Sequence, residues 1–391
     1  MTSSKSNPKN LTIGIVTDIH HWYDSDGRLC SFGPYVREID LWSNIFGKVI
    51  IAGGVGRGPM PNYCQPYLRQ DLKFIPIYHV PGNSWLNRLK RIINIPRIAI
   101  GTGRIIKSSD LIHLRMPSFS SLIAMVLLRL TNKARIAKWA SEFAPWRGEP
   151  VTSQIQRILL KNNFLSGPVM VYGSHTEPHL VSFFPAAMTN AELQNVLELS
   201  GKHPCEGDAL ILMVGRLVEA KGFDLGIQSL SALALRNPAL PWRAIVIGEG
   251  RMREPLEHLS VQGGISDRVE FVGGKSFAEV LSFFARADVL LMPGQLEGFS
   301  KVLIEACASG TIPVATDVGL SPWILDNGKR GFLAKPNPDE LSEKLEMALT
   351  ITSAKRNELI KQGMEFAANL TLESFENKVR TLILNVLSGR C

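Results

Sequence analysis

Two glutamates with seven residues between them, Glu297 and Glu305, mark the segment of this sequence that is most suggestive of chemistry. The segment follows an apolar run at 287–292, and Ser300 is a favourable N-cap, so we expect a helix to begin there. Glu297 then lies in the preceding loop and Glu305 in the second helical turn. Free N–H groups at such a helix start can hold a phosphate. Glutamates are also common near helix starts as ordinary solvated charges, so this pattern alone leaves both interpretations open.

Cations and glycines follow two other strand candidates. The run at 209–214 is followed by Gly215, Arg216 and, five residues later, Lys221; the run at 243–247 ends in Gly248-Glu-Gly250. The carboxyl ends of parallel strands are where open α/β sheets bind ligands. By themselves, Arg216 and Lys221 would be read as surface charges, which is the usual case for these residue types.

These segments together resemble the family-4 retaining glycosyltransferases of GT-B architecture, the glycosyl transferases group 1, of bacterial polysaccharide or glycolipid type. The resemblance rests on the paired glutamates in their EGF…IEA frame and on three further segments in the expected order. These are Val214-Gly-Arg-Leu217 with Lys221-Gly-Phe-Asp224, Ile247-Gly-Glu-Gly250, and Arg268-Val-Glu-Phe-Val-Gly273. A single motif would carry a high risk of a chance match, whereas four in order make a specific signal.

The resemblance implies roles for individual residues. Arg216 and Lys221 would neutralise the diphosphate of a nucleotide-sugar donor, because fixed cations stabilise the charge that develops on a departing diphosphate. Glu305 would bind the ribose hydroxyls, and Glu297 the hydroxyls of the transferred sugar. The donor-binding set implied is Gly215, Arg216, Lys221, Gly248, Gly250, Gly298, Phe299, Ser300 and Glu305, and no metal site is expected.

The first half of the chain matches the family less closely. The segment Asp110-Leu-Ile-His113-Leu-Arg115 resembles the end of the family's fourth strand, where His113 or Arg115 would reach the donor sugar or the acceptor. On an apolar strand, His113 is otherwise a core histidine. The glycine-rich loop that the family has after its first strand is replaced here by a long loop at 18–34. In the family, this loop lets backbone amides approach the donor or the acceptor, and either Gly27 or Gly33 is expected to take that role.

Other site types are poorly supported. The glycine clusters at 53–58 and 101–103 lack the dinucleotide-binding spacing, and no P-loop motif occurs. The segment His175-Thr-Glu-Pro-His179 contains Pro178, which prevents the helical face of a zinc protease. Five scattered cysteines without a CxxC pair argue against a disulfide framework and against a zinc site.

The chain alternates short apolar runs with helical patterns, which predicts an α/β fold with parallel sheets. Its 391 residues are enough for two domains. The resemblance implies a GT-B fold of two Rossmann-like domains facing a central cleft. The expected acceptor-side domain covers 1–200 and the nucleotide-sugar-binding domain covers 208–352, and the resemblance implies that helix at 353–391 returns to the first domain. The polar stretch at 200–208 is the expected hinge.

The formal charge of +8 and the pI near 9.2 favour anionic partners. Basic clusters at 88–91 and 129–138, with Trp85, Leu86 and an apolar helix near Leu122, predict peripheral contact with an anionic membrane; a solvated helix face is the alternative. No nucleic-acid motif accompanies the charge. The N-terminus lacks a secretory pattern, so the expected location is the cytoplasm, with association at the inner face of the membrane.

The resemblance implies transfer of a hexosyl group, with retention, from a nucleotide diphosphate sugar to a saccharide or lipid-linked saccharide acceptor. The expected setting is polysaccharide or glycolipid synthesis, with no cofactor besides the donor. Two alternatives stay open: a sugar-nucleotide epimerase of GT-B fold, and a non-catalytic paralogue that binds a sugar nucleotide. The sequence does not distinguish them, because function depends on the site and not on the fold.

Overall fold

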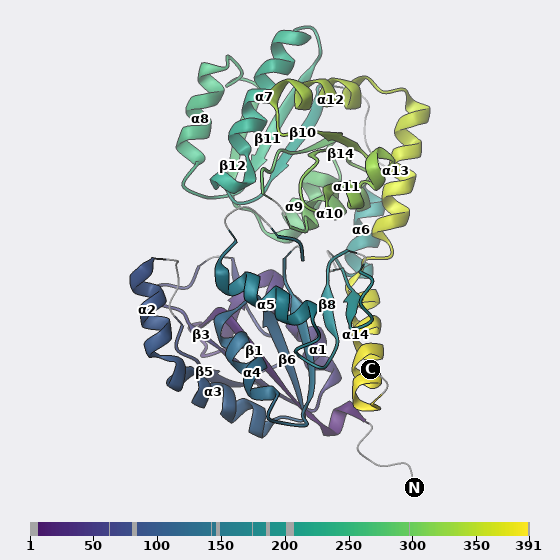
Figure 1. Ribbon diagram of the computed structural model, residues 1–391. Coiled ribbons are helices and arrows are strands. Elements are labelled where there is room, and N and C mark those ends of the chain that lie inside the picture. The colour runs from purple at the N-terminus through teal and green to yellow at the C-terminus, as the bar shows by residue number, and fades with distance from the viewer. Residues whose placement is uncertain are drawn as a thin grey trace. The chain divides into compact units, whose positions relative to one another are not determined.

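A computed structural model describes residues 7–389 except 62, 80–83, 142, 146–148, 174, 185–187, 201–206 and 297. The chain divides into two compact units (Figure 1). Unit 1 comprises Met1–Phe184 and Glu376–Cys391, and unit 2 comprises Pro185–Phe375. Each unit has its own sheet, and the two are described separately.

Unit 1 is built on a mostly parallel sheet in the order β5-β3-β1-β6-β7-β8-β9. β2 and β4 extend it as antiparallel strands beside the far end of β1. The elements are η2 (Pro8–Asn10), β1 (Thr12–Tyr23), β2 (Leu29–Phe32), α1 (Gly33–Ile45), β3 (Lys48–Val55), β4 (Cys64–Pro66), β5 (Lys73–Pro76), α2 (Trp85–Ile93), α3 (Ile95–Ser108), β6 (Leu111–Met116), α4 (Phe119–Leu128), β7 (Ala134–Trp139), α5 (Val151–Lys161), β8 (Val169–Val171) and β9 (Leu180–Ser182).

The segment expected to be a long loop at 18–34 is instead a β-hairpin followed by the first turn of α1. β1 continues to Tyr23 and pairs with β2. The turn between them is closed by the Asp24 carboxylate, which accepts hydrogen bonds from the backbone N–H groups of Asp26 and Arg28 at 3.0 and 2.8 Å. Short polar side chains that bond to the backbone in this way favour tight turns.

Unit 2 has a wholly parallel sheet in the order β12-β11-β10-β13-β14-β15. Its elements are α6 (Asn190–Ser200), β10 (Ala209–Val214), η3 (Glu219–Lys221), α7 (Phe223–Arg236), β11 (Trp242–Ile247), α8 (Arg253–Gln262), β12 (Val269–Gly273), α9 (Phe277–Phe284), β13 (Val289–Met292), α10 (Lys301–Ala308), β14 (Ile312–Thr316), α11 (Ser321–Ile324), η4 (Asp326–Gly328), β15 (Phe332–Ala334), α12 (Pro338–Thr350) and α13 (Ser353–Ala367). α14 (Leu372–Leu387) begins in unit 2 and belongs to unit 1 from Glu376 onward.

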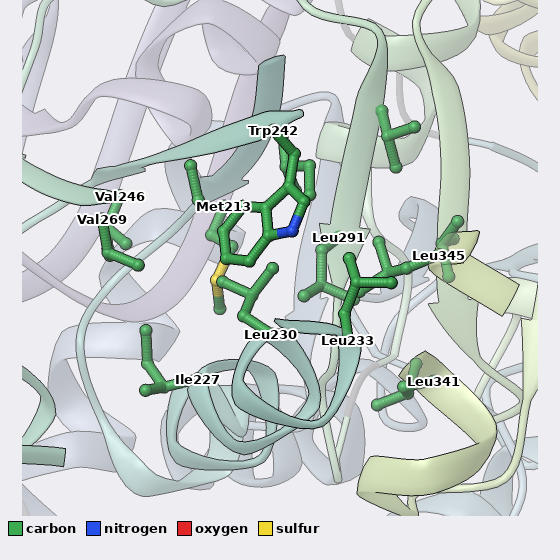
Figure 2. Close-up of a cluster of buried hydrophobic side chains, with 14 of the residues drawn as sticks. Met213, Ile227, Leu230, Leu233, Trp242, Val246, Val269, Leu291, Leu341 and Leu345 are labelled. Atoms are coloured by element: carbon green, nitrogen blue, oxygen red, sulfur yellow. The ribbon is translucent and has the colours of Figure 1, made fainter. Parts of the chain in front are cut away.

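The core of unit 2 fills the space between the sheet and the helices α7 and α12 (Figure 2). Trp242 at the start of β11 is 2% exposed, and its indole lies among leucines of both helices, including Leu230, Leu233 and Leu345. Strands buried on both faces read as continuous apolar runs, which is why the strands of this sheet are visible in the sequence. The core therefore fixes the strands whose carboxyl ends carry the candidate site.

The division between the units does not follow the expected hinge at 200–208. It falls between Phe184 and Pro185, so that α6 belongs to unit 2, where it packs near α9 and α10. Of the expected hinge, residues 201–206 lie outside the described residues. Among the described helices, none combines the length and the apolar character that crossing a membrane requires.

Candidate functional site

In unit 2, the loops that follow β10 and β11 are joined to each other. The N–H of Gly215 donates to the Ile247 carbonyl at 3.0 Å, and the N–H of Leu217 donates to the Glu249 carbonyl at 2.9 Å. Gly248, with a φ of +151°, brings its Cα against the Gly215 carbonyl oxygen, and a Cβ at that position would overlap it. The structure therefore brings Gly215, Gly248 and Gly250 together at the carboxyl edge of the sheet.

Lys221 ends the short helix η3, directly before α7. Gly222 has a φ of +63°, which is the left-handed conformation that glycine adopts without penalty. A Cβ on Gly222 would overlap the carbonyl oxygen of Pro293, so this turn presses against the end of β13. The glycine after Lys221 thus holds the lysine beside the loop that leads to α10.

A small cavity of about 50 Å³ lies at the meeting point of these loops. Gly215 and the half-buried Lys221 line it from the β10 side, and Ser300 and Val302 line it from the start of α10. The remaining lining comes from Val214, Phe223, Leu291, Met292, Pro293 and Gly294. One cation and a helix start thus meet in one cavity, and this combination suits a phosphate group.

The start of α10 differs from the start of α4 in unit 1. Ser300, the N-cap of α10, is 5% exposed and makes no side-chain capping hydrogen bond. At α4, by contrast, the Asp18 carboxylate accepts hydrogen bonds from the N–H groups of Phe119 and Ser120 at 2.7 and 3.3 Å. Burial raises the pKa of Asp18, but His79, Ser120 and the backbone outweigh it and hold the pKa below its ordinary value. The protein's own carboxylate therefore occupies the anion-binding position of α4.

The other donor-side residues fall at different places around the cavity. Arg216 is exposed in the loop between Gly215 and η3. Glu305 lies one turn into α10 and is 7% exposed. Gly298 and Phe299 precede Ser300, and the Gly298 carbonyl accepts a hydrogen bond from the N–H of Leu320 at 3.1 Å. Glu297 lies outside the described residues.

The sequence reasoning missed the loop after β13 as part of this site. Pro293 and Gly294 line the cavity, and the Gly294 carbonyl accepts a hydrogen bond from the Thr316 hydroxyl at 2.5 Å. Thr316 is 0% exposed at the end of β14, so this bond fastens two strand ends together. The Pro-Gly pair directly after an apolar strand is a turn signal that would have pointed to this loop.

In unit 1, the structure corrects the expectation that His113 contacts a substrate. Its side chain is 0% exposed, and its ring centroid lies 4.4 Å from that of Trp42. Neither ring nitrogen has a hydrogen-bond partner among the described residues. Burial lowers the pKa of His113 to about 3. The residue is a core histidine because the middle of β6 is covered on both faces.

Arg115, two residues later on β6, lies at the end of a buried charge cluster. Its guanidinium lies 5.0 Å from the centre of the Tyr35 ring and 3.8 Å from Glu38 Oε2. The same Glu38 oxygen lies 2.6 Å from Nζ of Lys138, whose side chain is 1% exposed. Arg115 itself keeps a fifth of its side-chain surface exposed, although its Nη1 is buried, and its contact with a substrate stays a prediction.

The backbone N–H groups of Gly27 and Gly33, the two glycines predicted for the first loop, both donate hydrogen bonds within unit 1. The N–H of Gly27 donates to the Asp24 carbonyl within the β1–β2 turn, at 3.1 Å. The N–H of Gly33 donates to the Tyr63 carbonyl, also at 3.1 Å, where α1 begins beside β4. Both amides are thus used inside unit 1, so neither N–H is available to approach a donor or an acceptor.

Part of this chain is similar to proteins of known family. Residues 198–366 match the family model described as Glycosyl transferases group 1. An uncharacterized glycosyltransferase of Methanocaldococcus jannaschii is 32% identical over 170 residues, which are 43% of this chain and 46% of that protein. The chain thus aligns with less than half the length of this curated relative.

Solved structures resemble the whole chain at low identity. An α,α-trehalose 6-phosphate synthase from Burkholderia multivorans has a TM-score of 0.73 at 13% identity, covering 98% of this chain and 100% of that one. The HepE protein of Anabaena, solved in complex with UDP and glucose, has a TM-score of 0.66 at 14% identity, covering 96% and 99%. The fold is therefore that of the GT-B glycosyltransferases, with two Rossmann-like units, and residues 198–366 are similar to the glycosyl transferases group 1 family.

Proposed function

We propose that this protein transfers a hexosyl group from a nucleotide diphosphate sugar to a hydroxyl of a saccharide or lipid-linked saccharide, with retention at the anomeric carbon. The observation that carries the proposal is the cavity where Lys221, Gly215 and the start of α10 meet. A lysine and a helix N-terminus both favour the anionic diphosphate of such a donor. The name of the HepE complex, with UDP and glucose, supports a donor of this class.

In this proposal, the bond between the anomeric carbon and the diphosphate oxygen breaks, and its electron pair goes to the diphosphate. The acceptor oxygen attacks from the same face, and its proton passes to the departing phosphate oxygen. Lys221 and Arg216 stabilise the negative charge that develops on the diphosphate. Glu305 binds the ribose hydroxyls and Glu297 those of the transferred sugar. These cations supply the charge that a divalent metal supplies elsewhere, so activity should persist in chelator.

The test is incubation of the purified protein with UDP-, GDP- and ADP-sugars, with and without a membrane lipid extract. We expect one donor to raise the melting temperature and to release its nucleoside diphosphate only when extract is present. Product analysis distinguishes an epimerase, which would convert the donor without an acceptor. The absence of both a thermal shift and release with every donor would overturn the proposed donor site.

A further inference from the structure

Helix α2 of unit 1 presents its apolar side to solvent. Trp85 is 72% exposed, and Ile92 and Ile93 are 59% and 66% exposed. Leu86 and Leu89 are also about half exposed, at 49% and 46%, and the helix contains no buried residue. Figure 1 shows α2 at the margin of unit 1, next to α3.

The apolar residues of α2 lie on a single face. At about 100° per residue, Trp85, Leu86, Leu89, Ile92 and Ile93 fall within an arc of about 120°. The half-buried residues of this helix are Asn87 and Arg91, which lie on the opposite side. A helix on the surface of a globular protein normally buries its apolar stripe and exposes its polar one. α2 does the reverse.

This orientation leaves a contiguous apolar stripe in water on a helix of only nine residues. Exposed apolar patches of this kind mark binding surfaces, because scattered apolar residues are normal on a protein surface and clustered ones are not. The Ser84 hydroxyl accepts a hydrogen bond from the N–H of Asn87 at 3.3 Å, so the helix start is capped. A formed helix is therefore available for docking.

The charge around α2 indicates the partner. Residues 72–109 contain seven Lys and Arg and no Asp or Glu. Arg88 and Lys90 lie on either side of the apolar arc, each about 40° beyond its edge on a helix of about 100° per residue. The following helix α3 adds exposed Arg97, Arg104 and Lys107. A second copy of this chain would bring the same acid-free segment and be repelled.

We propose that α2 is an interfacial helix that docks unit 1 on a bilayer containing anionic lipid. The apolar stripe enters the boundary between headgroups and acyl chains, and Arg88 and Lys90 reach the phosphates at its edges. The exposed cations of α3 add long-range attraction to the anionic surface. The sequence also suggested the apolar helix near Leu122 and the basic cluster at 129–138, and the structure buries part of each. α4 buries Ala124, Met125 and Leu128, and Lys138 is paired in the interior with Glu38.

The test is co-sedimentation of the full chain with phosphatidylcholine vesicles and with vesicles that also contain phosphatidylglycerol. We expect binding to the anionic vesicles that weakens as salt is raised. The double variant L89E/I92E changes two exposed residues, so its melting temperature should match that of the parent while its vesicle affinity falls at least tenfold. The matched control L235E/V261E alters exposed apolar residues of α7 and α8, at 81% and 64% exposure, and should bind as the parent does.

A second variant separates charge from apolar contact. R88Q/K90Q should lose the preference for anionic vesicles, whereas exchanging Lys361 and Arg286 of unit 2 for glutamine should not. Equal binding to both vesicle types, undiminished binding by L89E/I92E, or recruitment to an acidic protein in place of vesicles would overturn the proposal. The result is independent of the proposed function, because the thermal shift with a nucleotide sugar should be the same in the α2 variants as in the parent.

Discussion

Gly248 and Gly215 approach each other so closely that the carbonyl oxygen of Gly215 occupies the place where a Cβ of Gly248 would stand. The contact joins the loops after β11 and β10, one of which lines the cavity. We expect Gly248→Ala to separate these loops and to abolish the thermal shift with a nucleotide sugar. Backbone strain of this kind costs on the order of 1–3 kcal/mol, so the free energy of unfolding should fall as well.

Gly264→Ala is the matched control for this variant. Gly264 also has a positive φ, of +67°, but no atom lies within 4 Å of its would-be Cβ. In Gly264→Ala, the free energy of unfolding should fall only by the cost of placing alanine in this backbone conformation. Donor binding should be unchanged. Equal donor binding in Gly248→Ala and Gly264→Ala would contradict the assignment of the cavity as the donor site.

Lys221 is expected to contribute more to the chemical step than to folding. Lys221→Ala removes a cation from the cavity, and a lost electrostatic stabiliser of a transition state typically lowers kcat by about 10²–10³-fold. The comparison variant is Lys361→Ala, because the Lys361 side chain on α13 is 77% exposed and away from the cavity lining. Steady-state kinetics with the identified donor measure both. Unchanged turnover in Lys221→Ala would reject the proposed role.

The sequence allowed prediction of the parallel sheets and most of the donor-side loops, because both are local patterns. Buried parallel strands are continuous apolar runs, and the turns at Gly215, Gly222 and Gly248 need glycine for steric reasons. The family resemblance then supplied roles that spacing alone does not. Lys221 and Ser300 are 79 positions apart in the chain, and only the fold shows that they line one cavity.

The errors concern residues whose environment depends on distant partners. The basic cluster predicted at 129–138 includes Arg135 and Lys138, which lie on β7. Lys138 is interior because Glu38, a hundred positions earlier, supplies its counter-ion. Arg135, by contrast, is held by residues close to it in the chain, since it donates to the carbonyls of Leu128 and Thr131 at 2.7 Å. No local pattern predicts the distant partner of Lys138.

The burial of His113 predicts that replacing it will not impair catalysis. His113→Leu removes two buried ring nitrogens that lack hydrogen-bond partners within the described part of the chain. Leaving such groups unsatisfied costs about 1–3 kcal/mol. The free energy of unfolding of the variant should therefore equal or exceed that of the parent. Thermal melting and steady-state kinetics measure the two effects. A large loss of turnover with an unchanged melting temperature would restore the original substrate-contact hypothesis.

His113 and His21 also predict acid sensitivity of unit 1. Burial lowers the pKa of His21 to about 4 and that of His113 to about 3, from an ordinary value near 6.5. Below pH 6.5 the unfolded chain therefore binds protons that the folded chain does not, and stability falls as the pH is lowered toward 4. Melting temperatures between pH 7 and pH 4 should show this decline. His113→Leu should flatten it, and an identical decline in that variant would show that other groups cause it.

The buried pair of Lys138 and Glu38 gives the last prediction. Removing one partner of a buried ion pair strands the other charge and typically costs about 3–5 kcal/mol, whereas replacing both by apolar residues is often neutral. Lys138→Met should therefore destabilise unit 1, and Lys138→Met with Glu38→Leu should recover much of the loss, since Arg115 keeps some contact with solvent. Hydrogen exchange of the β6 and β7 amides measures stability locally in the intact chain. If the double variant is as unstable as Lys138→Met alone, mutual neutralisation is not the only role of the pair. Glu38 is then also required to hold Arg115 beside Tyr35.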